Sequence, residues 1–194
     1  MEKYFFWSFL ANLLFIFGAI GYLFMYILDY KHSKLFKTFS TNLIYIFLAM
    51  IFVINATLQF FAIYYINKHT QRYYTMILSS IFDKFASHAY LIGAIFTLTA
   101  ATKVNLISTF NTLGVCGFLI GASINLMIPE MNRLYICADY LNLLGALFYL
   151  LAIMVNQIPL AQIIVIAGDV VYLVAAVLYM ICWTQERREM IIQK

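Results

Sequence analysis

Long apolar runs separated by short polar segments dominate the chain. Six of these runs approach the length that an α-helix needs to cross a bilayer, about 20 residues. They cover residues 4–28, 42–66, 87–102, 104–128, 135–156 and 160–183. The runs are continuously apolar, whereas the strands of a membrane β-barrel would alternate polar and apolar residues. The pattern therefore predicts an all-α, polytopic transmembrane bundle of about six spans, with residues 1–194 forming a single integral membrane domain.

Residues 71–85, which precede the short third run, have an amphipathic pattern. Apolar side chains recur there at helical spacing, and the polar ones fall on the opposite side of the helix. The apolar set is Tyr73, Tyr74, Ile77, Leu78, Ile81, Phe82 and Phe85, and the polar set is Arg72, Thr75, Ser79, Ser80, Asp83 and Lys84. This pattern predicts an interfacial helix that lies in the headgroup layer or leads obliquely into the third span. A structural collar is favoured over a peptide-like membrane activity.

The composition requires lipid as the main solvent of the chain. Its residues are 65% hydrophobic and only 10% charged, whereas a soluble domain carries roughly 25% charged residues. The net charge of +4 is modest and its basic residues are spread over several loops, which argues against a nucleic-acid surface. The predicted partner is therefore the lipid bilayer, together with a second copy of the chain or another membrane protein.

The distribution of basic residues predicts the orientation. Eight Lys and Arg residues lie on the side of the two termini and four lie on the other side, which places both termini in the cytoplasm. The eight are Lys3, Lys68, Arg72, Lys84, Arg133, Arg187, Arg188 and Lys194, and the four are Lys31, Lys34, Lys37 and Lys103. The expected location is a cell membrane, specifically a bacterial inner membrane.

Polar and small residues form a stripe on one face of each of the last three spans. They recur at three- and four-residue spacing, which keeps them on one side of a helix. The stripes are Asn111, Gly114, Phe118, Gly121 and Asn125; Asn142, Gly145, Tyr149, Ala152 and Asn156; and Asp169, Tyr172, Ala176, Tyr179 and Trp183. The second span has a shorter version with Asn55, Gln59 and Ala62. Small residues allow close helix packing, and Gly114, Gly117, Gly121 and Gly145 are the predicted packing positions.

The same stripes support two interpretations. They are either contact faces held by hydrogen bonds worth about 0.6 kcal/mol each, or the walls of a polar interior at mid-depth. The candidate interior consists of Asp169, Tyr172, Asn142, Asn111, Asn125, Asn55 and Gln59.

Asp169 discriminates best between the two interpretations. It lies about nine residues into its span, hence ~14 Å deep. An ionised carboxylate at such a depth costs about 2.5–3.5 kcal/mol on insertion scales, so its helix should turn it inward. A neutral Asp169 paired with an amide is the structural interpretation, and proton or cation handling is the functional one. Asp139, near the end of its span, is expected to meet water or headgroups.

Motifs of known enzymes and cofactor sites are absent from the sequence. It contains no HExxH, GxSxG, P-loop or GxGxxG motif. His32, His69 and His88 do not pair across spans as axial haem ligands would, and Cys116, Cys137 and Cys182 form no CxxC pair. No catalytic residue, cofactor or metal site is therefore predicted.

Spans four and five resemble the short helical hairpins of YrhK-type membrane proteins. The resemblance covers less than half of the chain, with Ala152 where the family pattern favours Gly and Asp169 where it favours a Gly-Ser step. The matching residues are Asn111, Gly114, Phe118, Gly121 and Ala122, then Asn142, Gly145 and Tyr149, with Gly168 and Tyr172 in the sixth span. The resemblance implies helical hairpins in a membrane and no particular chemistry.

Three functions follow as hypotheses. The first is a non-enzymatic protein whose packing faces join it to itself or to a membrane partner. The second is a small proton- or cation-linked transporter or channel that uses the stripe around Asp169. An intramembrane enzyme ranks last, because no nucleophile–base pair is visible.

Overall fold

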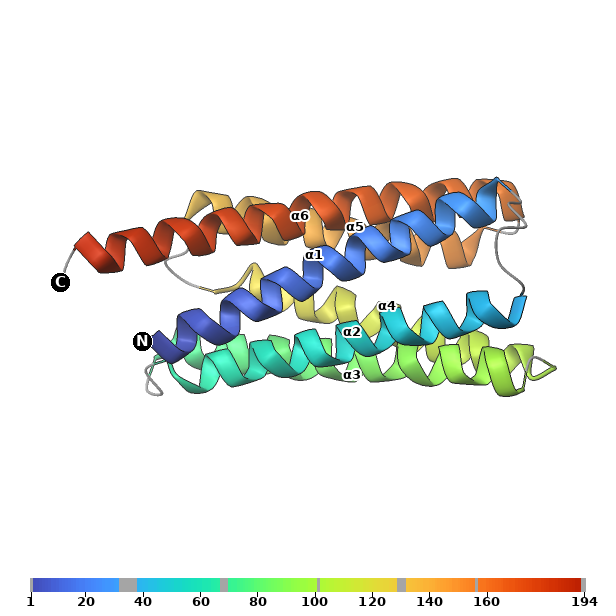
Figure 1. Cartoon of the computed structure of the whole chain (residues 1–194), viewed down its shortest axis with the longest axis horizontal. Coiled ribbons are helices and arrows are strands. Elements are labelled where there is room, and N and C mark those ends of the chain that lie inside the picture. The colour runs from blue at the N-terminus through green and yellow to red at the C-terminus, as the bar shows by residue number, and fades with distance from the viewer. Residues whose placement is uncertain are drawn as a thin grey trace.

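The described part of the protein is a bundle of six helices, each antiparallel to the next along the chain (Figure 1). The computed structural model describes residues 2–31, 38–66, 70–100, 102–128, 132–155 and 157–192. The helices are α1 (Glu2–Tyr30), α2 (Thr38–Tyr64), α3 (Gln71–Thr99), α4 (Val104–Asn125), α5 (Arg133–Met154) and α6 (Ile158–Ile192). They run side by side along one axis, and α1 begins at the same end of the bundle at which α6 finishes (Figure 1). We call this the termini end and the opposite one the far end. The predicted all-α bundle is confirmed.

Several residues used in the sequence predictions lie outside the described residues. They are His32, Lys34, Lys37, Lys68, His69, Asn156 and Lys194.

The six helices form a closed ring. Within the described residues, each helix packs against its two neighbours in the chain, and α6 returns to pack against α1. Among the described residues, no other pair of helices has closely packed backbones, so contacts across the ring are made by side chains. The centre is therefore filled by side chains or left open, and no helix occupies it.

The segment 71–85 is the first half of α3 rather than a separate interfacial helix. Thr70 caps the helix by accepting a 3.2 Å hydrogen bond from the backbone N–H of Tyr73, and the helix then continues to Thr99. Its apolar side chains face outward: Tyr74 is 62% exposed and Ile81 50%. Its polar side faces the interior, where Ser79 and Ser80 are buried. Of the two predicted placements, the one leading into the third span is correct.

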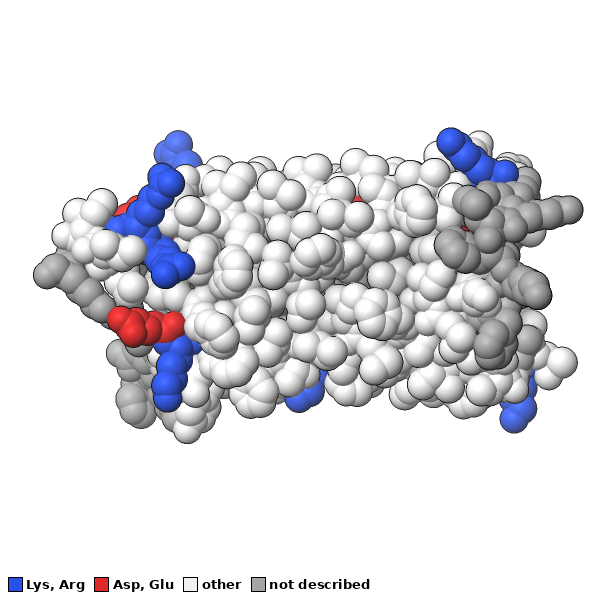
Figure 2. All heavy atoms as spheres, viewed as in Figure 1, with Lys and Arg blue, Asp and Glu red and all other residues white. Residues whose placement is uncertain are grey.

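The outer surface of the ring is apolar. On α6, Val170, Val174, Val177 and Ile181 are each at least 42% exposed, and this face lies opposite Asp169. Charged side chains on the face seen in Figure 2 gather mainly toward the two ends of the bundle. Apolar side chains on the outside and ionisable ones on the inside are typical of a protein surrounded by lipid.

Five helices are long and apolar enough to cross a membrane: α1, α2, α4, α5 and α6. The sixth, α3, has 29 residues, as many as α1, and lies in the same ring. Polar residues in its first half, including Arg72 and Asp83, reduce its mean hydropathy. Their inward position explains how α3 is accommodated beside five apolar helices.

One arrangement of residues recurs in all six helices. Each has an aromatic side chain on the inner face, preceded three residues earlier by a residue that is at most 2% exposed. The aromatic residues are Tyr22, Phe52, Tyr90, Phe118, Tyr149 and Tyr179, and the residues before them are Ala19, Ala49, Ser87, Val115, Ala146 and Ala176. Compact residues at helix contacts allow close packing. The six aromatic rings can therefore project inward.

Candidate functional site

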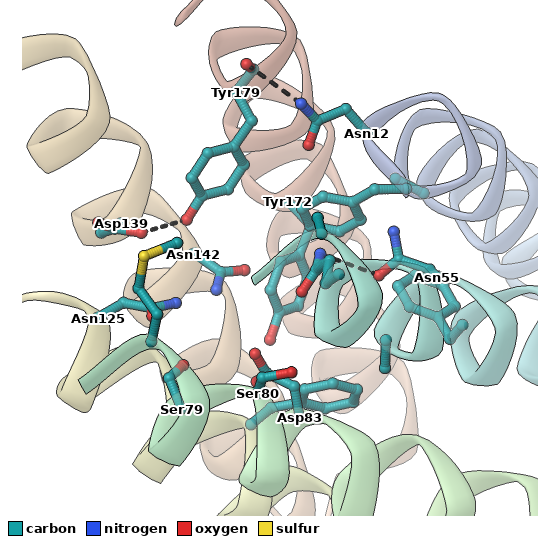
Figure 3. A pocket seen from close by; sticks show the side chains of 18 of the residues that line it. Asn12, Asn55, Ser79, Ser80, Asp83, Asn125, Asp139, Asn142, Tyr172 and Tyr179 are labelled. Atoms are coloured by element: carbon teal, nitrogen blue, oxygen red, sulfur yellow. Dashed lines mark hydrogen bonds between the residues drawn. The ribbon is translucent and has the colours of Figure 1, made fainter. Parts of the chain in front are cut away.

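A cavity of about 220 Å³ lies inside the ring and is lined by side chains from all six helices (Figure 3). At the termini end its walls include Tyr4 of α1, Arg72 of α3 and Tyr135 of α5. Inward, it reaches Tyr90 and Asp169. At ~30 Å³ per water molecule, this volume corresponds to about seven waters. A small solute of similar size would therefore fit.

A layer of tyrosines lies at the inner end of the cavity. Tyr26 of α1 packs against Tyr45 of α2 and Tyr149 of α5, with ring centroids 5.7 and 6.4 Å apart. The Tyr45 hydroxyl donates a 2.6 Å hydrogen bond to Asp29. These rings bridge the interior toward the far end, so the cavity extends from the termini end only.

Two tyrosine–aspartate pairs join α5 to α6. The Tyr149 hydroxyl on α5 donates a 2.5 Å hydrogen bond to Oδ1 of Asp169 on α6. In reverse, the Tyr179 hydroxyl on α6 donates to Oδ1 of Asp139 on α5. In both helices the tyrosine follows the aspartate by ten residues. Because the helices are antiparallel, this common spacing brings each tyrosine opposite the aspartate of the other helix.

The second oxygen of each carboxylate is unpaired. Asp139 and Asp169 are both 2% exposed, and neither Oδ2 atom has a hydrogen-bond partner among the described residues. The hydroxyl of the buried residue Ser80 also has no hydrogen-bond partner among the described residues. A buried, unpaired carboxylate oxygen is costly unless a proton or a cation is bound there. All three residues line the cavity, and the two carboxylate oxygens are hydrogen-bond acceptors.

A third carboxylate, Asp83 of α3, also lines the cavity. It lies against Gly121 of α4, whose missing side chain leaves room for it. Nearby, the Ser79 hydroxyl donates a 3.0 Å hydrogen bond to the Gly121 carbonyl oxygen. Figure 3 shows Asp83, Asp139, Asn55 and Asn142 directed into the same space from three helices, α3, α5 and α2.

The three carboxylates lie at successive depths. Asp139 is six residues after the start of α5, and Asp83 is twelve after the start of α3. Asp169 is level with Tyr149, sixteen residues after the start of α5. At 1.5 Å per residue these positions are ~9, ~18 and ~24 Å from the termini end. Among the lining residues, the other charged side chain is Arg72 at the mouth.

Amide side chains complete the polar wall. The Asn55 amide donates a 2.5 Å hydrogen bond to the Ala11 carbonyl oxygen and accepts a 3.1 Å bond from Gln59. Asn12 donates a 3.5 Å bond to the Tyr179 carbonyl oxygen. Asn125 and Asn142 also line the cavity.

Of the seven residues predicted to form a polar interior, six line this cavity. They are Asp169, Tyr172, Asn142, Asn125, Asn55 and Gln59. The seventh, Asn111, does not line it and lies against Gly93 between α3 and α4.

The four predicted packing glycines are buried at contacts between helices. A Cβ atom on Gly117 would lie 2.9 Å from the Ala86 Cβ atom, and one on Gly114 would lie 2.5 Å from the Tyr90 ring. Gly121 adjoins Asp83 as described, and Gly145 faces the Tyr172 ring at 3.0 Å.

The mouth of the cavity carries an ion pair. Arg72 Nη2 lies 3.8 Å from Glu186 Oε1, which joins α3 to the end of α6. Both side chains are partly exposed, at 38% and 28%. Beside them, the Trp183 indole N–H donates a 2.9 Å hydrogen bond to the Phe5 carbonyl oxygen.

Two carboxylates of this site were not predicted as interior residues. The expectation that Asp139 meets water or headgroups is wrong, because Tyr179 covers one of its oxygens and the residue is 2% exposed. Asp83 was assigned to the polar side of an interfacial helix, and that side faces the cavity. The shared Asp-to-Tyr spacing of ten residues in α5 and α6 was the available signal.

Within the described residues, no three side chains of His, Cys, Asp or Glu converge closely enough to hold a metal ion. Comparison with protein-family models, curated proteins and solved structures found no match. The resemblance to YrhK-type hairpins stays a prediction.

Proposed function

We propose that this protein is a proton- or cation-linked membrane transporter for a small polar solute. The observation that carries the proposal is the cavity itself: it is lined by all six helices, has polar side chains at several depths and is bordered by tyrosines toward the far end. A polar cavity that reaches mid-depth from one end is what a transporter needs when it exposes its site to one side at a time.

The repeated architecture supports the same proposal. An inner aromatic residue recurs in every helix, and the first three helices run in the opposite order to the last three. We propose that the two halves act as inverted repeats, which let a transporter alternate between two related conformations. In the described conformation the cavity is reached from the termini end. The related conformation would expose it from the far end.

The buried carboxylates give the proposed transporter a means of coupling. Three carboxylates line the cavity at different depths: those of Asp139, Asp83 and Asp169. In Asp139 and Asp169 one carboxylate oxygen has no hydrogen-bond partner among the described residues. Ionisable groups at such positions are common in proton and ion pathways. Asp169 is the innermost, so its occupation by a proton or cation would govern the step between the two conformations.

We propose six spans in a bacterial inner membrane, with the termini end in the cytoplasm. The wide lateral surface of apolar side chains would then contact lipid. The cavity in its described conformation would open to the cytoplasm.

Flux measurements in proteoliposomes test the transport proposal. Internal pH is followed with a trapped dye after a pH gradient is imposed, with and without added monovalent cations and amines. We expect a flux with the wild-type protein that is abolished by Asp169→Asn. Asp29→Asn is the matched control, because Asp29 is at the far end, bonded to Tyr45, and does not line the cavity.

The packing hypothesis makes the opposite prediction in the same experiment. If Asp169→Asn changes only stability or oligomeric state and the wild-type protein moves no ion or solute, transport is refuted. The stripes would then serve assembly alone. A product formed from lipid or peptide and lost in Asp169→Asn would instead indicate an enzyme.

A further inference from the structure

The innermost part of the cavity combines one carboxylate with several aromatic rings. Asp169 is placed there by α6, and its Oδ2 atom is buried without a hydrogen-bond partner in the described part of the chain. The Tyr149 hydroxyl donates its hydrogen bond to the other oxygen, Oδ1. The unpaired oxygen is an acceptor, so it calls for a ligand that donates an N–H or O–H group.

Four tyrosines, one from each of four helices, line the cavity together with this carboxylate, and the Tyr149 hydroxyl donates a hydrogen bond to it. The four are Tyr22 of α1, Tyr90 of α3, Tyr149 of α5 and Tyr172 of α6. Tyr149 and Tyr172 are in direct ring contact, with centroids 5.8 Å apart. We call this set the tyrosine cage.

Aromatic rings arranged around a negative charge favour an organic cation. The faces of aromatic rings attract ammonium groups, and cages of such rings recognise ammonium ligands. The rings also offer apolar contact to carbon atoms, which a small inorganic ion does not use. Further out, Phe52 and Phe118 extend this apolar wall, with centroids 6.5 Å apart.

We infer that the cavity binds a small organic ammonium ion, a protonated primary or secondary amine with an apolar body. Its N–H group bonds Asp169 Oδ2, and its carbon atoms pack within the tyrosine cage. The volume of the whole cavity, about 220 Å³, limits the ligand to about seven non-hydrogen atoms, if each takes roughly the ~30 Å³ of a water molecule. This assignment names the solute class of the proposed transporter and rests on that proposal for its role as a transported substrate.

The other carboxylates give the ammonium ion a path of entry. Asp139 has the same unpaired Oδ2 atom at a shallower depth, and Asp83 lies between the two. At the mouth, Arg72 has Glu186 as its partner, which reduces its repulsion of an incoming cation. A cation therefore meets a carboxylate at each stage between the mouth and Asp169.

Equilibrium binding tests the inference without requiring transport. Cyclohexylamine, which is protonated at neutral pH, and cyclohexanol have the same size and shape and differ in charge. Each is titrated calorimetrically into the full chain in lipid nanodiscs, with empty nanodiscs subtracted. We expect saturable binding of cyclohexylammonium and at least tenfold weaker binding of cyclohexanol. Equal binding of the two would overturn the inference, and so would saturable sodium binding that excludes cyclohexylammonium.

Variants locate the binding site. Asp169→Asn should weaken cyclohexylammonium binding at least tenfold, whereas Asp29→Asn should leave it unchanged. Tyr90→Leu should also weaken binding, while Tyr90→Phe, which keeps the ring, should retain it. Thermal unfolding of each ligand-free variant shows whether it is folded. Unchanged binding in a folded Asp169→Asn variant contradicts the assignment.

The two proposals fail in different ways. Binding of cyclohexylammonium at Asp169 without any flux in proteoliposomes would refute the transport function and leave the ligand class in place. Flux of protons or inorganic cations that depends on Asp169, without ammonium binding, would refute the ligand class and leave the transport function in place.

Discussion

Replacing Tyr149 by phenylalanine isolates the hydrogen bond that the hydroxyl makes with Asp169. The ring would keep its contacts with Tyr172 and Tyr26, at centroid distances of 5.8 and 6.4 Å, and with Gly168 beneath it. What is lost is the 2.5 Å bond from the hydroxyl to Oδ1. Because Oδ2 already has no partner among the described residues, the carboxyl group would be left without any.

The size of the loss depends on the charge of Asp169. A hydrogen bond to a charged group contributes about 1.5–3 kcal/mol to stability, whereas one between neutral groups contributes about 0.5–1.5 kcal/mol. Tyr149→Phe should therefore lower the free energy of unfolding by ~2 kcal/mol if Asp169 is ionised and by ~1 kcal/mol if it is protonated. Tyr179→Phe, in the equivalent pair with Asp139, should have an effect of similar size.

Tyr22→Phe is the matched control. Tyr22 lines the same cavity and, like Tyr149, is an inner aromatic residue that follows a buried alanine by three residues. Its hydroxyl has no hydrogen bond within the described residues. Its replacement should change stability by no more than about 0.5 kcal/mol. Unfolding is followed by circular dichroism during titration with SDS in mixed micelles. Two results would refute the hydrogen bond between Tyr149 and Asp169. One is that Tyr149→Phe is no more destabilising than Tyr22→Phe. The other is that Tyr149→Phe shows no coupling to Asp169→Asn in a double-mutant cycle.

Two further substitutions test how the ring is held together. Gly117→Ala should destabilise the protein by about 1–3 kcal/mol, because its Cβ atom would lie 2.9 Å from Ala86 Cβ and 3.2 Å from Ala86 Cα. Gly168→Ala should be less destabilising than Gly117→Ala in the same unfolding assay, since its nearest atoms belong to side chains at 3.1 Å or more. The reverse order would contradict the packing of α3 on α4. Asn55→Leu should cost about 0.6–1.7 kcal/mol through loss of the bond to the Ala11 carbonyl oxygen, and an unchanged midpoint of unfolding would refute that contact.

The helices could be predicted because run length and continuous hydropathy leave few alternatives in lipid. The inward direction of Asp169 followed from the same physics, since a carboxylate at its depth avoids acyl chains. The stripes predicted six of the residues that line the cavity, but its full lining could not be predicted in this way. It depends on which helices are neighbours, and a single sequence does not define the order of helices around a ring.

The residues that were misplaced show where local rules are insufficient. The polar face that includes Asp83 has the same periodicity whether it meets water, headgroups or a cavity. Asp139 lies only six residues after the start of α5, so its depth alone did not distinguish an interfacial position from an interior one. Asn111 shares the spacing of the stripe, yet Gly93 on α3 provides the space that its amide occupies. Each outcome was decided by a residue on a neighbouring helix.

Accessibility of single cysteines to a water-soluble reagent tests the cavity most directly. In a variant in which Cys116, Cys137 and Cys182 are replaced, Asn142→Cys lines the cavity, whereas Leu144→Cys, two residues away, lies on the outer face where Leu144 is 40% exposed. A charged methanethiosulfonate reagent reacts with the hydrated thiolate. The account predicts that Asn142→Cys is modified from the termini end of the protein in proteoliposomes and that Leu144→Cys is not. Modification of Leu144→Cys, with Asn142→Cys unreactive, would show that the polar faces do not enclose a hydrated cavity.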